Sequence, residues 1–128
     1  MTRFQQTFAR GLVAASLLFA NSVELNTARA AGALAIGACG AYGVSYDYDQ
    51  VEAASAAALG KCTGNCQVAT AIRGSCAALS IDVRDACGAY GYAAAPRLGQ
   101  AQNTALRYCY RNGGKDCVIR AWACDGKG

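Results

Sequence analysis

The sequence predicts an α+β domain of two strand-strand-helix-strand repeats, related by a pseudo-twofold axis and stabilised by disulfides. The pentapeptide Cys-Gly-Ala-Tyr-Gly occurs at 39–43 and again at 87–91. Each copy opens a stretch that holds four cysteines in the same order, and the apolar positions of a predicted helix recur between the halves at one constant offset. We therefore expect one duplicated domain over 31–128, with repeats at about 32–76 and 77–125.

Residues 1–30 have the pattern of a secretory signal peptide that is cleaved after Ala30. Two arginines precede a short apolar core at 11–20, and Ala-Arg-Ala at 28–30 has the small-x-small form of a cleavage site. The apolar core is shorter than the roughly 20 residues that a membrane span needs, although an uncleaved anchor is the alternative. We expect an exported protein, periplasmic or extracellular, without stable membrane insertion.

The charge balance and the absence of histidine exclude several function classes. Twelve Lys and Arg stand against eight Asp and Glu, and removal of 1–30 takes away three Arg and one Glu, which leaves nine against seven. These dispersed cations do not form the clustered footprint of a nucleic-acid-binding protein. No histidine is present to activate a serine or cysteine nucleophile.

The first half begins with two predicted strands. Leu34 and Ile36 alternate with small residues, and 39–46 is apolar and aromatic. Asp49, with Glu52 three positions on, has the pattern of a capping box that starts a helix. The apolar stripe of this helix is Val51, Ala54, Ala58, Leu59 and Cys62. A third strand is expected from Cys66 to Ile72.

The second half repeats these elements. Leu79 and Ile81 correspond to Leu34 and Ile36, the strand at 87–92 corresponds to 39–44, and Pro96 fits the first turn of a helix. The second helix stripe is Leu98, Ala101, Ala105, Leu106 and Cys109, and the last strand is 117–123. One helix with a single apolar stripe cannot bury it alone. We therefore expect one antiparallel or mixed sheet with two helices packed on one face.

The repeated pentapeptide has an architectural interpretation. Glycine within a strand lets a helix or a neighbouring backbone approach closely. We expect Tyr42 and Tyr90 to fill equivalent places in the sheet, and any function to lie where the halves differ. The differing segments are 46–49, 83–85 and 111–116.

The eight cysteines are expected to form disulfides, as exported small domains commonly do. Cys62–Cys66 and Cys109–Cys117 each close a short loop between a helix and a strand, so we prefer them as local bridges. Symmetry favours Cys76–Cys124 and Cys39–Cys87 between the halves, which is a hypothesis because about a hundred connectivities exist. The alternative, zinc bound by four cysteines, is disfavoured by their uneven spacing, and we expect no metal site and no cofactor.

Several short motifs together resemble a known family. They are Gly-Ala-Leu-Ala-Ile at 32–36, an Ala-rich helix ending at Cys62, Cys66-Gln-Val, Ser75-Cys76-Ala-Ala-Leu, and Ala121-Trp122-Ala123-Cys124. Over nearly all of 31–125 the chain resembles domain-of-unknown-function family 4189, small exported bacterial proteins that include secreted mycobacterial members. Simpler members carry cysteines matching four of these eight. The resemblance thus implies Cys62–Cys66 and Cys76–Cys124, leaves Cys39–Cys87 and Cys109–Cys117 for the others, and implies no established activity.

The residues that we expect to bind a partner are aromatic or charged. They are Tyr46, Asp47, Tyr48, Arg73, Arg120 and Trp122. Aromatic side chains offer large contact area at low entropic cost. The leading hypothesis is an exported binding domain of the inhibitor or secreted-effector type, without catalysis, whose partner is a protein or a cell-envelope component.

Two alternatives to this hypothesis stay open. One is a hydrolase of cell-wall or extracellular glycan or peptide that uses Asp47, Asp49 or Glu52 with arginines. The other is a structural protein of the cell envelope.

Overall fold

The computed structural model describes residues 30–125, so the predicted signal peptide lies, except for its last residue, outside the described residues. Over these residues the chain forms six strands, two α-helices and one short 3₁₀ turn. These are β1 (Ala31–Ile36), η1 (Ala38–Gly40), β2 (Tyr42–Tyr48), α1 (Val51–Lys61), β3 (Gln67–Arg73), β4 (Cys76–Asp82), β5 (Tyr90–Ala95), α2 (Leu98–Arg111) and β6 (Cys117–Cys124).

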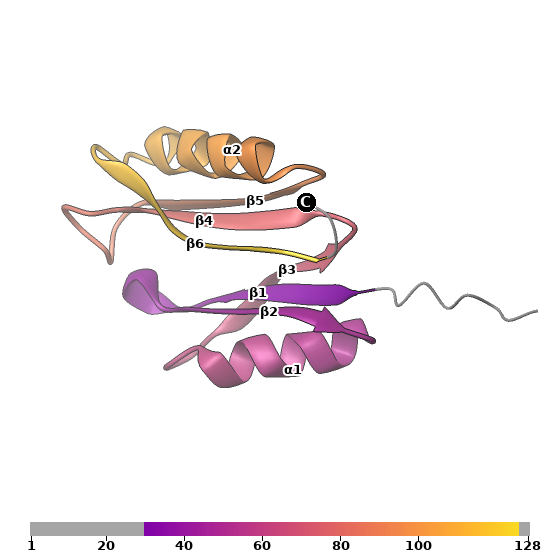
Figure 1. Cartoon of the computed structure of the whole chain (residues 1–128). Helices are drawn as coiled ribbons and strands as arrows, with labels where there is room; N and C mark the ends of the chain where they lie inside the picture. The colour runs from indigo at the N-terminus through magenta and orange to yellow at the C-terminus, as the bar shows by residue number, and fades with distance from the viewer. Residues whose placement is uncertain (1–29, 126–128) are drawn as a thin grey trace, which may run out of the picture.

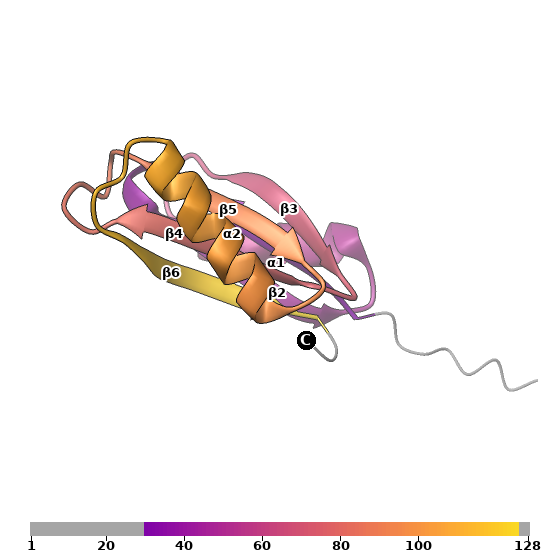
Figure 2. The same cartoon turned by 90° about the horizontal axis from the view of Figure 1, so that it is seen from above.

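The strands form two antiparallel sheets of three strands each, with orders β2-β1-β3 (sheet A) and β5-β4-β6 (sheet B). Figure 1 shows four layers: α1, sheet A, sheet B and α2. Figure 2 shows α2 lying along the outer face of sheet B. The α+β class is confirmed. The prediction of one sheet with both helices on one face is wrong, because the two halves stack face to face and each helix covers an outer face.

Side-chain size explains this stacking. The inner faces of the two sheets carry the large apolar side chains Leu34, Ile72, Leu79 and Ile81, which form one shared core together with Ala77, Ala121 and Ala123. The outer faces carry alanines and cysteines, against which the helices pack through Ala54 and Ala58 in α1, and Ala101 and Ala105 in α2. Large side chains fill the wide space between two sheets, whereas small ones let a helix come close.

The glycines of the pentapeptide have the expected architectural role. A Cβ at Gly43 of β2 would collide with the Ala58 carbonyl of α1, and a Cβ at Gly91 of β5 would collide with the Ala105 carbonyl of α2. Each glycine therefore permits close contact between a strand and its helix.

Each sheet comes from one half of the chain, and both halves run strand, strand, helix, strand. The duplication and the pseudo-twofold axis stay predictions. Tyr42 and Tyr90, expected in equivalent places, each begin the second strand of their half, yet Tyr42 is half-buried and Tyr90 is exposed.

Several predicted boundaries are wrong by a few residues. Cys39 lies in η1 with φ 57° rather than in a strand, and β2 begins at Tyr42. The N-cap of α1 is Gln50, so Asp49 is not the cap, and no side chain caps the helix. Pro96 precedes Arg97, the N-cap of α2, and so lies outside the helix. Leu59, expected in the apolar stripe, is exposed.

All eight cysteines are paired in the structure. The bridges are Cys39–Cys87, Cys62–Cys66, Cys76–Cys124 and Cys109–Cys117, the pairs expected from the sequence. Only Cys39–Cys87 joins the two halves, and Cys62–Cys66 and Cys109–Cys117 close local loops. Cys76–Cys124 was expected between the halves, but Cys76 begins β4, so this bridge links the neighbouring strands β4 and β6 of sheet B. No cysteine is therefore left as a thiolate ligand for zinc.

Within residues 30–125, neither helix has the length and apolar character needed to cross a membrane.

Candidate functional site

The free edge of β5 differs from the rest of the sheet system. The pairings β1–β2, β1–β3 and β4–β6 each contain a register shift, whereas β4–β5 is regular from Cys76–Ala95 to Ile81–Tyr90. The β5 sequence, Tyr-Gly-Tyr-Ala-Ala-Ala, has no charge and no proline. Charged side chains, proline and bulges are the usual protections of an edge strand, so β5 is an unprotected edge.

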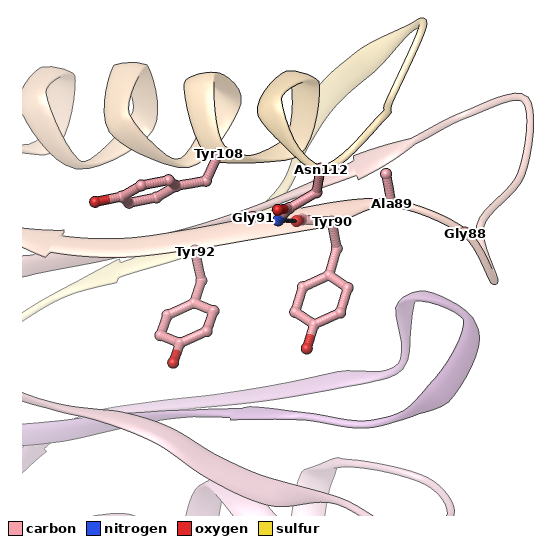
Figure 3. A pocket seen from close by; sticks show the side chains of 7 residues that line it. All are labelled: Gly88, Ala89, Tyr90, Gly91, Tyr92, Tyr108 and Asn112. Carbon is pink, nitrogen blue, oxygen red and sulfur yellow. Dashed lines mark hydrogen bonds between the residues drawn. The ribbon is translucent and has the colours of Figure 1, made fainter.

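The backbone of β5 presents alternate residues to this edge. The Ala89 carbonyl accepts a hydrogen bond from the Asp82 N–H of β4 (3.2 Å) and so points into the sheet. The Tyr90 carbonyl accepts instead from Nδ2 of Asn112, after α2 (2.8 Å), and so points outward (Figure 3). Because the direction alternates along an antiparallel strand, the N–H and C=O groups of Tyr92 and Ala94 also point outward.

A groove runs along this edge. Its volume is about 760 Å³, and it is lined by Gly88, Ala89, Tyr90, Gly91, Tyr92, Tyr108 and Asn112. We call it the tyrosine groove. Tyr90, Tyr92 and Tyr108 are 46%, 39% and 42% exposed. Figure 3 shows Tyr108 on the α2 side of β5 and the other two rings pointing away from α2, toward sheet A.

A second hollow adjoins the groove on the side of sheet A. Its volume is about 410 Å³, and it shares Tyr90 and Tyr92 with the groove. Its other lining residues are Ile36, Gly37, Ala38, Asn65, Gln67, Val68 and Ala69. We call it the β3 hollow. The two rings therefore separate two open spaces, one under α2 and one beside β3.

The β3 hollow is open because the two halves differ at one bulge. In β3 the residue at the register shift is Ala69, between Val68 and Thr70, and in β6 it is Arg120. The Arg120 guanidinium lies over the Tyr42 ring, 5.4 Å from its centroid. Ala69 is too short to cover Tyr90 in the same way, so the Tyr90 ring stays exposed.

The helix wall of the groove is positively charged. The Arg111 guanidinium lies 5.5 Å from the centroid of the Tyr108 ring. Nη2 of Arg107 donates to Oγ1 of Thr104, one turn before Tyr108 (3.3 Å). Neither α2 nor β5 contains an acidic residue. A ligand in the groove therefore meets aromatic surface, and the Arg111 guanidinium lies beside that surface, over the Tyr108 ring.

Three of the predicted binding residues lie together at the end of β2. Tyr48 pairs with Ala31 of β1, and Tyr46 and Asp47 form a bulge between this pair and Ser45–Ala33, with Asp47 in the left-handed region at φ 62°. Tyr46 is 56% exposed, whereas Tyr48 packs against the core between α1 and sheet A. The segment thus serves to bend a strand, and only Tyr46 presents most of its ring to solvent.

The other three predicted residues do not converge on this segment. Arg73 is exposed and pairs with Ala31 in the β1–β3 ladder. Tyr48 pairs with the same alanine in the β1–β2 ladder, on the other side of β1. Arg120 is held by Tyr42 and by the Gly40 carbonyl, to which its Nε donates (3.4 Å). Trp122 is half-exposed on the α2 face of β6, opposite Ala78. The structure therefore distributes these residues over separate surfaces.

The acidic residues considered for hydrolysis are all exposed. Asp47, Asp49 and Glu52 line neither the tyrosine groove nor the β3 hollow. In the described part of the chain the single ion pair is Arg84–Asp116 (3.9 Å). That same part contains no group of three or more His, Cys, Asp or Glu arranged to hold a metal ion.

Asp82 is the buried carboxylate with a displaced pKa. Its oxygens accept the backbone N–H groups of Lys115 (3.0 Å) and Arg84 (2.9 Å). These two hydrogen bonds lower the pKa of Asp82 below its ordinary 3.8, and the bond from the Lys115 N–H has the larger effect. The carboxylate fastens the 83–89 loop to the turn after α2, so its role is structural.

Sequence reasoning missed Tyr92, Tyr108 and Asn112 and gave Tyr90 only an architectural role. Four of the seven tyrosines lie between 90 and 110, and two of them alternate along one strand. This clustering is the signal that could have indicated the groove.

A family model described as a domain of unknown function (DUF4189) matches residues 31–124. Comparisons with curated proteins and with solved structures gave no match.

Proposed function

Since the chain belongs to the DUF4189 family, as its motifs predict, and the description of that family names no activity, we propose from the groove itself that the protein is an exported binding domain. It recognises a protein or cell-envelope component through the tyrosine groove. The observation that carries the proposal is the half-exposed set Tyr90, Tyr92 and Tyr108 around an unprotected strand edge. Exposed tyrosines clustered in a concave site are typical of binding surfaces.

The scaffold suits such a role. Four disulfides cross-link a domain of fewer than a hundred described residues, and one of them, Cys39–Cys87, joins its halves. A rigid groove loses little conformational entropy on binding, which raises affinity. Disulfides also persist only in oxidising compartments, which supports a periplasmic or extracellular location.

The proposed site lies where the halves differ. Of the three differing segments, 111–116 contributes Asn112 to the groove, whereas 46–49 and 83–85 do not line it. We propose that the halves arose by duplication and that one copy kept an arginine over its tyrosine while the other has Ala69. The first arrangement closes the surface and the second leaves it open for a partner. The hydrolase alternative has no comparable support among the described residues.

Affinity capture with matched variants tests the proposal. The wild-type protein, oxidised and immobilised, is exposed to envelope and extracellular extracts, and the retained proteins or glycans are identified by mass spectrometry. Tyr92→Ala with Tyr108→Ala removes two walls of the groove, and Ala69→Arg places over Tyr90 the cover that Arg120 gives to Tyr42. Tyr46→Ala is the control, because this tyrosine is exposed but lies outside the groove.

We expect a component that the wild type and the control retain and that both groove variants lose at least tenfold. Retention by all four proteins would place binding elsewhere. Loss in the Tyr46→Ala control alone would return the site to the end of β2.

A further inference from the structure

We infer that the tyrosine groove takes an extended peptide segment, which adds to β5 as the fourth strand of sheet B and places an acidic side chain against α2. The inference rests on the proposed binding function and specifies its partner. Strand addition to a free sheet edge is an established mode of peptide recognition, in which main-chain hydrogen bonds give affinity and side-chain pockets give specificity.

The first support is the free backbone of β5. The N–H and C=O groups of Tyr92 and Ala94 point outward, and no side chain of another described element donates to or accepts from them. The regular β4–β5 register keeps these groups in the spacing that an added strand needs. Five residues from Tyr90 to Ala94 offer a length of about 14 Å, which matches about five residues of an added strand, so a heptapeptide covers this edge with about one residue to spare at each end.

The second support is the placement of rings on both faces of the edge. An added strand sends alternate side chains to opposite faces. On one face they meet Tyr90 and Tyr92 above the β3 hollow, and on the other they meet Tyr108 beneath α2 (Figure 3). The groove thus offers contacts to both sets of side chains, which a flat edge would not.

The other sheet edges lack this combination. At β2 the Lys61 ammonium donates to the Val44 carbonyl (3.2 Å), and the bulge at Asp47 bends the strand. The edge strands β3 and β6 contain the bulges at Ala69 and Arg120. Lysine and bulges discourage strand addition. At β5 the Asn112 side chain occupies the Tyr90 carbonyl, but the strand is regular and uncharged and its edge is free from Tyr92 to Ala94, so β5 is the edge that fits a peptide.

Charge decides between a foreign peptide and a second copy of the chain. Two copies joined edge to edge through antiparallel β5 strands would bring their α2 helices side by side on one face. Arg107 and Arg111 of each copy would then face like charges, with no acidic residue on α2 to neutralise them. A peptide with an acidic residue on that face gains an attraction instead.

The probe is a synthetic heptapeptide that alternates valine and glutamate, with blocked ends. Its counterpart alternates valine and lysine. Binding is measured by calorimetry, and amide hydrogen exchange of Tyr92 and Ala94 by NMR. Ala94→Pro removes the outward N–H at an edge position where proline is tolerated, and Ala94→Thr is the size-matched control that keeps it.

We expect the glutamate peptide to bind the wild type and the threonine variant alike, to slow exchange of the Tyr92 and Ala94 amides, and to bind the proline variant about tenfold more weakly. The lysine peptide should bind at least tenfold more weakly than the glutamate peptide.

Four results would overturn the inference. They are equal binding to the proline variant, unchanged exchange of both amides, a preference for the lysine peptide, and no binding at millimolar peptide. Protection of both amides without peptide, in a protein that sediments as a dimer, would assign the edge to a second copy. None of these results decides the proposed binding function, which the affinity-capture experiment tests separately.

Discussion

The Arg120 guanidinium of β6 lies over the Tyr42 ring of β2, 5.4 Å from its centroid, and so joins the two sheets at their edge. Nε of the same arginine donates to the Gly40 carbonyl in η1 (3.4 Å). The β-bulge at Arg120 turns its side chain toward sheet A rather than toward α2. A residue that sequence alone presents as a binding candidate therefore forms an internal contact.

This contact should be measurable as a coupling free energy. Arg120→Ala and Tyr42→Leu, singly and together, form a double-mutant cycle in which we expect a coupling of about 0.5–1 kcal/mol in the free energy of unfolding. Denaturant titration gives the values. Arg73→Ala, an exposed arginine whose side chain makes no hydrogen bond or ion pair in the described chain, should change stability by less than about 0.5 kcal/mol. Additive effects of the two mutations would contradict the coupling.

A methyl group at Gly43 should destabilise the fold. In Gly43→Ala the new Cβ would meet the Ala58 carbonyl of α1, so strand and helix must separate. We expect a loss of about 1–3 kcal/mol in the free energy of unfolding. Gly60→Ala is the matched control, because a Cβ there meets nothing within 4 Å, and it should stabilise α1 by about 0.5 kcal/mol. Thermal or denaturant unfolding distinguishes the two, and equal effects would remove the packing argument.

The bridge between the halves, Cys39–Cys87, should contribute more than the local bridge Cys62–Cys66. Cys39–Cys87 spans 48 residues of sequence and Cys62–Cys66 spans 4. In the chain-entropy account, removal of the first by paired serine substitution costs about 4 kcal/mol, and removal of the second about 2 kcal/mol. Denaturant unfolding of the two variants under oxidising conditions checks the order. A larger loss of stability on removal of the local bridge would show that loop entropy does not determine how much each disulfide stabilises the fold.

Stability should fall in acid partly through Asp82. Its pKa is lowered in the folded state from the ordinary 3.8. The stabilisation is therefore complete well above pH 3.8 and is lost as the pH falls below that value toward the folded pKa. The thermal midpoint of Asp82→Asn should lie below that of the wild type at pH 7, and the gap should narrow by pH 2. Asp49→Asn, at an exposed position outside both helices, should keep the wild-type profile. A gap for Asp82→Asn that is constant with pH would refute the role of its charge.

The order of elements could be read from the sequence with modest errors. Alternating Leu34 and Ile36 marked a strand, and alanines at helical spacing marked α1 and α2. The predicted ends of elements were wrong where the tertiary structure overrode a local sequence pattern. Asp49 has the pattern of a cap, yet β2 continues to Tyr48 through a bulge and moves the helix start to Val51.

The candidate site was harder to predict. Tyr46 and Trp122 are conspicuous in the sequence, whereas Tyr90, Tyr92 and Tyr108 become a groove only when α2 packs on β5. The exposure of Tyr90 depends on Ala69, which belongs to the other half of the chain. No local pattern contains that relationship.

By itself the sequence determined the chain's family, the content of strands and helices, the use of its cysteines and the close strand–helix contacts at Gly43 and Gly91. Only the tertiary structure decided that the halves form two stacked sheets rather than one. Each sheet has two apolar faces, so alternation cannot tell which one takes the helix. Packing decides it, because alanines accommodate a helix closely while Leu34, Leu79 and Ile81 fill the space between sheets.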